Sequence, residues 1–108
     1  MNNILGKWKV VKVFKDFTPE LVPQYVSKNE ALELDQYKDD QSIKFITSTY
    51  EFTDNELKII KPNGEIFETL KYENRDGKIV VLEGEGAEIT FNEDGTITFM
   101  IILVLARV

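Results

Sequence analysis

Leu5-Gly6-Lys7-Trp8-Lys9-Val10, near the start of the chain, and Arg107, next to its end, together decide the fold. Trp8 lies near the start of the first expected strand, and Arg107 is the last residue of the last one. A guanidinium over an indole ring contributes about 0.5–2 kcal/mol, and more when it is desolvated. The pair is therefore able to hold the first strand against the last. A sheet whose first and last strands meet is a barrel.

Turn signals divide most of the chain into short segments that read as strands. They are Thr53-Asp54-Asn55, Pro62-Asn63-Gly64, Asp76-Gly77, Gly84-Glu85-Gly86 and Asp94-Gly95. Asn-Gly and Asp-Gly supply the positive φ angles of tight hairpin turns. Seven strands are expected, near Lys7–Phe14, Ile43–Phe52, Glu56–Lys61, Glu65–Glu73, Lys78–Glu83, Ala87–Phe91 and Thr96–Arg107. The pattern predicts an all-β, antiparallel up-and-down meander that folds as a sandwich or closes as a small barrel, and Trp8 with Arg107 favours the barrel.

Alternation along the strands predicts which side chains face inward. In one strand Ile66, Leu70 and Tyr72 share a face, opposite Thr69, Lys71 and Glu73. In another, Ala87, Ile89 and Phe91 alternate with Glu88 and Thr90. The first strand changes parity, and a bulge near Val10 explains that change, since barrels bend at bulges.

The segment from Thr18 to Asp40 is expected to be helical and to lie between the first and second strands. Thr18-Pro19 is typical of a helix cap followed by proline, and Pro23 predicts a break. Ser27 and Glu30 have the spacing of a capping box, which predicts a helix near Lys28–Lys38. Such a segment is expected to cover one mouth of the barrel.

Phe99 to Ala106 reads Phe-Met-Ile-Ile-Leu-Val-Leu-Ala and is apolar on both faces. It is too short to cross a membrane as a helix, which needs about 20 residues. A strand that is apolar on both faces needs cover on both. Two readings stay open: an internal strand covered by the chain's own helix, or a homodimer contact made through Phe99–Ala106.

The opening with Gly6 and Trp8 resembles the Gly-x-Trp motif of the lipocalin and fatty-acid-binding superfamily, the calycins. In lipocalins an arginine near the end of the last strand lies across that tryptophan at the closed end of the barrel. Trp8 and Arg107 match these positions in type and order, so the resemblance implies a lipocalin-like barrel with Gly6, Trp8 and Arg107 as its structural signature. Arg107 is followed only by Val108, so the Arg-x-Tyr carboxylate site of fatty-acid-binding proteins is not carried over.

Composition excludes several classes of function. The 108 residues suffice for one domain, 1–108. The chain has no cysteine and no histidine, and its net charge is −6. Disulfides, thiolate chemistry and the usual zinc and haem ligands are therefore absent, and no cofactor and no metal is expected. No basic surface for nucleic acid is apparent.

Met1 to Ile4 do not resemble a signal peptide, so a cytoplasmic location is expected. A secreted chain without its leader would have the same sequence pattern.

The favoured function is non-catalytic binding of a small hydrophobic ligand inside the barrel. The candidate lining residues are Tyr50, Phe52, Tyr72, Phe91 and Phe99, with the two tyrosine hydroxyls as polar contacts. Alternatively these aromatic side chains are simply core, and the protein is an interaction module that dimerises through its apolar C-terminal strand. A barrel enzyme that works through carboxylates or tyrosine ranks third, because no nucleophile motif is present.

Overall fold

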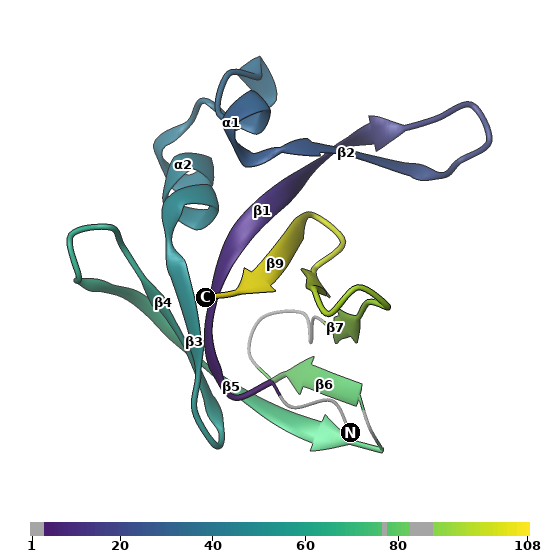
Figure 1. Ribbon diagram of the computed structural model, residues 1–108. Coiled ribbons are helices and arrows are strands. Elements are labelled where there is room, and N and C mark those ends of the chain that lie inside the picture. The colour runs from purple at the N-terminus through teal and green to yellow at the C-terminus, as the bar shows by residue number, and fades with distance from the viewer. Residues whose placement is uncertain (1–3, 77, 83–87) are drawn as a thin grey trace.

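The computed structural model describes residues 4–76, 78–82 and 88–108, and these form an eight-stranded antiparallel barrel with one additional strand and short helices (Figure 1). The barrel strands are β1 (Gly6–Phe17), β3 (Thr49–Phe52), β4 (Glu56–Ile60), β5 (Ile66–Arg75), β6 (Lys78–Val81), β7 (Glu88–Phe91), β8 (Ile97–Phe99) and β9 (Leu103–Arg107). The other elements are β2 (Pro23–Ser27), α1 (Lys28–Ala31), the 3-10 helix η1 (Asp35–Tyr37) and α2 (Asp40–Thr47).

Pairing of the first strand with the last closes the barrel, as the sequence predicts. Trp8 lies opposite Arg107, and Val10 lies opposite Leu105. The register shifts between Val10 and Lys12, which confirms the predicted bulge. A bulge increases the local twist of a strand, and here it lets β1 curve around the barrel. The sandwich alternative is therefore wrong.

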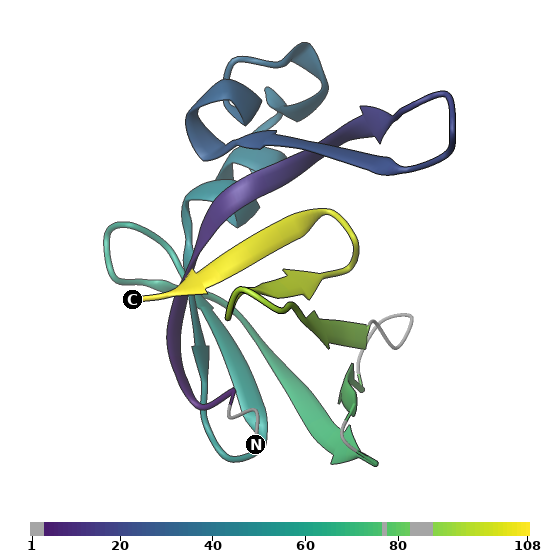
Figure 2. The same cartoon turned by 45° about the vertical axis from the view of Figure 1, so that its right-hand side comes forward.

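Thr18-Pro19 begins a hairpin turn and not a helix. The Leu21 amide donates to the Thr18 carbonyl over 2.8 Å, and the Thr18 amide donates to the Val22 carbonyl over 2.9 Å. The chain then returns as β2 along the outer half of β1. Pro19 restricts the backbone of the turn, but it is the pairing of β1 with β2 that makes the chain reverse here and form a hairpin. The β1–β2 ribbon extends beyond the barrel, as Figure 2 shows.

The helical region lies between β2 and β3 and is more broken than the sequence predicts. Ser27 caps α1 by accepting from the Glu30 amide over 3.3 Å, as expected. The helix ends at Ala31, however, and η1 and α2 follow. The predicted strand Ile43–Phe52 is also wrong in its first half. Asp39 caps α2 there by accepting from the Ser42 amide over 3.0 Å. The helical spacing places the Ile46 side chain in the core.

The predicted strand Thr96–Arg107 is two strands, β8 and β9, which raises the seven predicted strands to the eight of the barrel. A turn of three residues, Met100, Ile101 and Ile102, separates them, and the first two have φ angles of 57° and 68°. The Ile102 amide donates to the Phe99 carbonyl over 3.2 Å. Strand β9 pairs with β8 on one side and β1 on the other. Strand β9 therefore has no free edge, and the homodimer contact through Phe99–Ala106 stays a prediction.

The core fills the described part of the barrel with the alternation that the sequence predicts, apart from one strand. Ile89 is buried and Phe91 partly so, while Ala87 lies outside the described residues together with 83–86 and their turn. In β5 Tyr72 is buried, but Ile66 is 55% exposed. The register shifts opposite it, between Ile59 and Ile60. Phe67 therefore packs against the core in place of Ile66.

Candidate functional site

The five sequence-predicted ligand contacts lie in or against the hydrophobic core. Tyr50, Phe52, Tyr72 and Phe99 are buried, and Phe91 is half-buried. The rings of Tyr50 and Phe99 meet edge to face with centroids 6.0 Å apart, and those of Phe52 and Tyr72 do so at 5.5 Å. Such pairs stabilise the barrel beyond their buried area. Whether any of the five contacts a ligand stays a prediction.

Both tyrosine hydroxyls proposed as polar contacts donate to backbone carbonyls. Tyr50 donates to Phe45 over 2.6 Å, and Tyr72 donates to Thr53. Burial raises the pKa of Tyr50 far above its ordinary value. Burial also raises the pKa of Tyr72, and the Asp54 carboxylate acts in the same direction. Each hydroxyl stays protonated at neutral pH with its donor in use, so only acceptor lone pairs remain for a ligand.

Trp8 and Arg107 make the predicted contact. The guanidinium carbon of Arg107 lies 4.3 Å from the Trp8 ring centroid, and Arg107 Nη1 donates to the Leu5 carbonyl over 2.6 Å. Trp8 Nε1 donates to the Ile4 carbonyl over 2.9 Å. Gly6 adopts a φ of 119°, and a Cβ there would lie 3.0 Å from Arg107 Nη1. The Gly-x-Trp spacing thus places a residue without a side chain beneath the guanidinium.

A cavity of about 110 Å³ lies between α2 and the turn that joins β8 to β9. Its lining comes from Tyr37, Ser42, Phe45, Ile46, Phe99, Met100, Ile102 and Leu103. Leu103 begins β9 and Arg107 ends it. The cavity and the Trp8–Arg107 contact therefore lie at opposite ends of that strand. Of the five predicted ligand contacts, Phe99 lines this cavity.

The polar groups of the cavity wall are already bonded within the protein. The Tyr37 hydroxyl donates to the Phe14 carbonyl over 2.5 Å, and Ser42 Oγ donates to Asp39 Oδ1 over 2.7 Å. The bonds from Ser42 hold the pKa of the Asp39 carboxyl below its usual range. The wall presents aromatic and aliphatic surface with two hydroxyl acceptors. It therefore offers dispersion and desolvation, not proton transfer.

Sequence reasoning missed the α2 contribution because it treated Ile43–Phe52 as a strand, whereas η1 lies within the helical stretch predicted near Lys28–Lys38. The available signal was Asp39 followed three residues later by Ser42, which is the spacing of an N-cap and its partner. Phe45 and Ile46 then lie three and four residues after Ser42, on one face of a helix. Asp39 is thus a cap for α2, in addition to being solvent-exposed.

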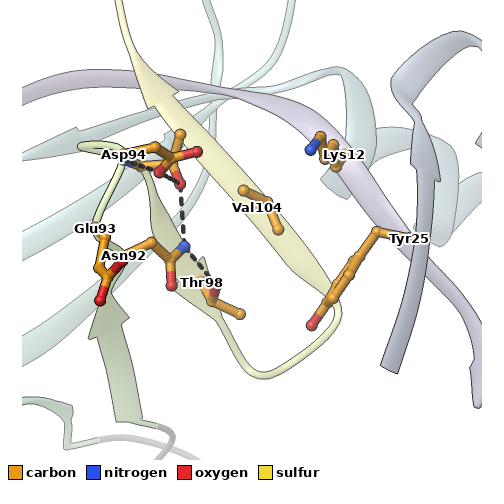
Figure 3. Close-up of a pocket in the computed structure, with 8 residues that line it drawn as sticks. Lys12, Tyr25, Asn92, Glu93, Asp94, Thr98 and Val104 are labelled. Carbon is orange, nitrogen blue, oxygen red and sulfur yellow. Dashed lines mark hydrogen bonds between the residues drawn. The ribbon is translucent and has the colours of Figure 1, made fainter. Parts of the chain in front are cut away.

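A second, shallower groove of about 600 Å³ lies on the outer surface of the barrel (Figure 3). Lys12 and Tyr25 border it on the ribbon side, Val104 lies between, and the β7–β8 turn forms the far side. There Asn92 Nδ2 donates to the hydroxyls of Thr96 and Thr98 over 3.0 and 2.9 Å.

The acidic side of this groove is also bonded internally. The Thr96 amide and hydroxyl both donate to Asp94 Oδ1, over 3.0 and 2.6 Å. These bonds lower the pKa of Asp94, and Lys12 acts in the same direction. Its bonds fix the turn in place, so we do not assign the groove a ligand. Within the described ranges, no cluster of acidic side chains is suited to hold a metal ion.

No family model, curated protein or solved structure matches the chain. The fold assignment therefore rests on the closed barrel itself. In the part of the chain that the structure describes, no helix has the length and apolar character needed to cross a membrane.

Proposed function

We propose that the chain is a calycin-like barrel that binds a small apolar molecule, or the apolar end of a larger one, between α2 and the β8–β9 turn. The observation that carries the proposal is the apolar cavity of about 110 Å³ lined by Phe45, Phe99 and Leu103. A closed apolar cavity of about 150 Å³ binds benzene or xenon, and the cavity here has a comparable volume but opens to the surface at Met100 and Ile102. The closure of β1 on β9 by Trp8 and Arg107 supports the calycin-like assignment.

The cavity limits the ligand to a single ring or a short alkyl chain. Burying about 150 Å² of ring surface contributes roughly 4 kcal/mol before the cost of immobilising the ligand. A Kd on the order of 1 mM or weaker is therefore expected. Met100 and Ile102 extend the apolar wall out to the surface, where both are partly exposed. A ligand whose apolar end enters the cavity and whose remainder lies along this rim buries more area. Such a ligand is expected to bind more tightly than benzene.

Benzene titration followed by methyl NMR tests the proposal. The methyl resonances of Ile46 and Leu103 are expected to shift with a Kd on the order of 1 mM or weaker, because both side chains line the cavity. Leu103→Phe fills the cavity and is expected to abolish the shifts. Ile43→Ala removes a side chain that is 37% exposed on the same helix and is expected to leave them unchanged. Unperturbed Ile46 and Leu103 methyls at benzene saturation would overturn the proposal.

A further inference from the structure

Two hairpin turns hold large apolar side chains in the left-handed region, where glycine and asparagine are favoured. Leu21 has a φ of 62° in the β1–β2 turn, and Met100 and Ile101 have 57° and 68° in the β8–β9 turn. Two successive positive φ angles at the centre of a hairpin turn are the geometry that usually calls for Asn-Gly. A β-branched residue such as Ile101 is a marked outlier there.

These strained positions gain little packing within the chain. Leu21 is 78% exposed and Ile101 is 62% exposed. Backbone strain persists where another requirement maintains it, and such positions cluster at functional sites. What has to be explained is therefore why these positions hold large apolar side chains when glycine or asparagine would form the same turns with less strain.

The β8–β9 turn lies against the ribbon, and the β1–β2 turn lies at the tip of that ribbon. The Tyr25 hydroxyl donates to the Ile101 carbonyl over 2.7 Å, and the Phe14 amide donates to the Ile102 carbonyl over 2.7 Å. The Phe14 ring contacts the rings of Tyr25 and Phe17 edge to face, which continues the contact towards the ribbon tip. Figure 2 shows the β8–β9 turn beside the ribbon. We call the exposed apolar side chains here the ribbon-end surface; they are Phe17, Leu21, Val22, Met100, Ile101 and Ile102.

Among the residues that the structure describes, no third strand pairs with the outer part of the ribbon. Strand β9 pairs with β1 as far as Val13, whereas β2 pairs with β1 as far as Phe17. A two-stranded hairpin is marginally stable in water without further packing. A partner that covers this end would supply that packing.

The ribbon-end surface is large enough for a dimer contact. Its six side chains are between 38% and 78% exposed, which for residues of this size amounts to on the order of 600 Å². Complete burial of these side chains on two copies removes at most about 1,200 Å² from water, which reaches the lower end of the range for specific protein interfaces.

The charge of the ribbon favours a second copy over an anionic surface. Residues 12–27 carry two lysines, Lys12 and Lys15, and two acids, Asp16 and Glu20, so their net charge is zero. The net charge of −6 therefore lies on the rest of the chain. An anionic membrane would repel that remainder. A two-fold contact joins a surface to itself, and a neutral surface meets no like-charge excess there.

We propose that the ribbon-end surface binds a second copy of this chain in a two-fold dimer. The contact uses the tips of the β1–β2 and β8–β9 hairpins, not the edge of β9. Met100 and Ile102 belong both to this surface and to the cavity wall, whereas Phe17, Leu21 and Ile101 do not line the cavity. Substitutions at these three positions therefore test the dimer without altering the cavity wall.

Sedimentation velocity over a concentration series tests the dimer. Leu21→Gly/Ile101→Gly removes both exposed side chains and places glycine where φ is positive. The double variant is expected to weaken dimerisation at least tenfold. Its thermal midpoint, measured where both proteins are monomeric, is expected to equal or exceed that of the wild type. Phe17→Thr, which alters a strand and no turn, is also expected to weaken dimerisation. Ile66→Thr, which removes a similarly exposed side chain from β5, is expected to change nothing.

Two results overturn the dimer. The first is a wild-type chain that stays monomeric throughout the series, and co-sedimentation of that monomer with phosphatidylcholine vesicles would assign the surface to lipid instead. The second is a dimer that neither Leu21→Gly/Ile101→Gly nor Phe17→Thr weakens. Benzene binding is measured separately, so failure of the dimer leaves the ligand proposal standing, and the reverse also holds.

Discussion

Gly6 satisfies two constraints that no other residue type meets together. Its φ is 119°, and the space where a Cβ would lie is occupied by Arg107 Nη1 at 3.0 Å. At Gly64 φ is also positive, at 92°, but nothing lies within 4 Å of the Cβ position. A comparison of alanine substitutions at the two glycines therefore separates the cost of backbone strain from the cost of steric crowding.

Gly6→Ala is expected to destabilise the protein by about 1–3 kcal/mol and to move the guanidinium of Arg107 off the Trp8 ring. Gly64→Ala is expected to cost less, because strain alone acts there. Chemical denaturation measures the stabilities, and near-ultraviolet circular dichroism reports on Trp8, the single tryptophan. Equal losses in the two variants, with an unchanged Trp8 signal, would contradict the role assigned to Gly6.

Trp8→Ala is expected to cost about 3–5 kcal/mol, as for other buried tryptophans. The ring is 2% exposed, bonds to the Ile4 carbonyl and lies under Arg107. The loss is measured by urea denaturation. Stability near that of the wild type would mean that other contacts close the barrel.

Tyr50 is expected to make the fold sensitive to alkaline pH. Burial raises its pKa in the folded state, so the unfolded chain loses this proton first, near pH 10. The unfolded state then binds fewer protons than the folded state, and stability falls as pH rises above about 10. Tyr50→Phe is expected to flatten this fall, although it is less stable at pH 8 because the Phe45 carbonyl loses its donor. If stability falls equally with pH in the wild type and in Tyr50→Phe, Tyr50 does not cause the sensitivity to alkaline pH.

At the scale of the elements, α2 depends on its cap. Asp39 accepts from the Ser42 amide and hydroxyl, and these bonds lower its pKa. A lowered carboxyl pKa contributes stability above the unfolded pKa of about 3.9, and this stability is lost as pH falls through the folded value. Asp39→Ala is expected to lower the thermal midpoint at pH 7, whereas Asp39→Asn keeps most of the cap. The midpoint of Asp39→Asn is also expected to depend less on pH below 4. Identical thermal midpoints for Asp39→Ala and the wild type would show that the Asp39 cap does not stabilise α2.

The elements that sequence analysis missed share one cause. The turn at Met100 and Ile101 and the bend at Leu21 contain no glycine or asparagine at their left-handed positions, so local turn chemistry gives no signal there. Helix α2 was hidden because Phe45 and Ile46 suit a strand as well as a helix. In each case contacts with distant segments outweigh local preference.

For the whole molecule, the register of β1 against β9 predicts a cross-link. Lys9 lies opposite Ala106, and opposed residues of antiparallel strands have Cα separations suited to a disulfide. The chain has no cysteine of its own. Lys9→Cys/Ala106→Cys is therefore expected to oxidise to a single intramolecular disulfide. It closes a loop of about 100 residues and stabilises the fold by up to about 4–5 kcal/mol.

Thermal unfolding with and without reductant measures that gain. Lys9→Cys/Thr98→Cys is the matched control, since Thr98 lies on β8, one strand beyond β9, about 10 Å from β1. Efficient oxidation of the control, or none in the Ala106 pair, would contradict the closure of the barrel between β1 and β9.

The sequence by itself determined the all-β class, most strand positions, the bulge near Val10 and the meeting of Trp8 with Arg107. These follow from local alternation, turn residues and one strongly specific pair. Only the tertiary structure decided the ribbon β1–β2, the eighth barrel strand and the cavity beneath α2. Each of these depends on contacts between segments distant in the chain, such as that of Phe14 with Ile102. The pattern within a short window of sequence carries no information about such contacts.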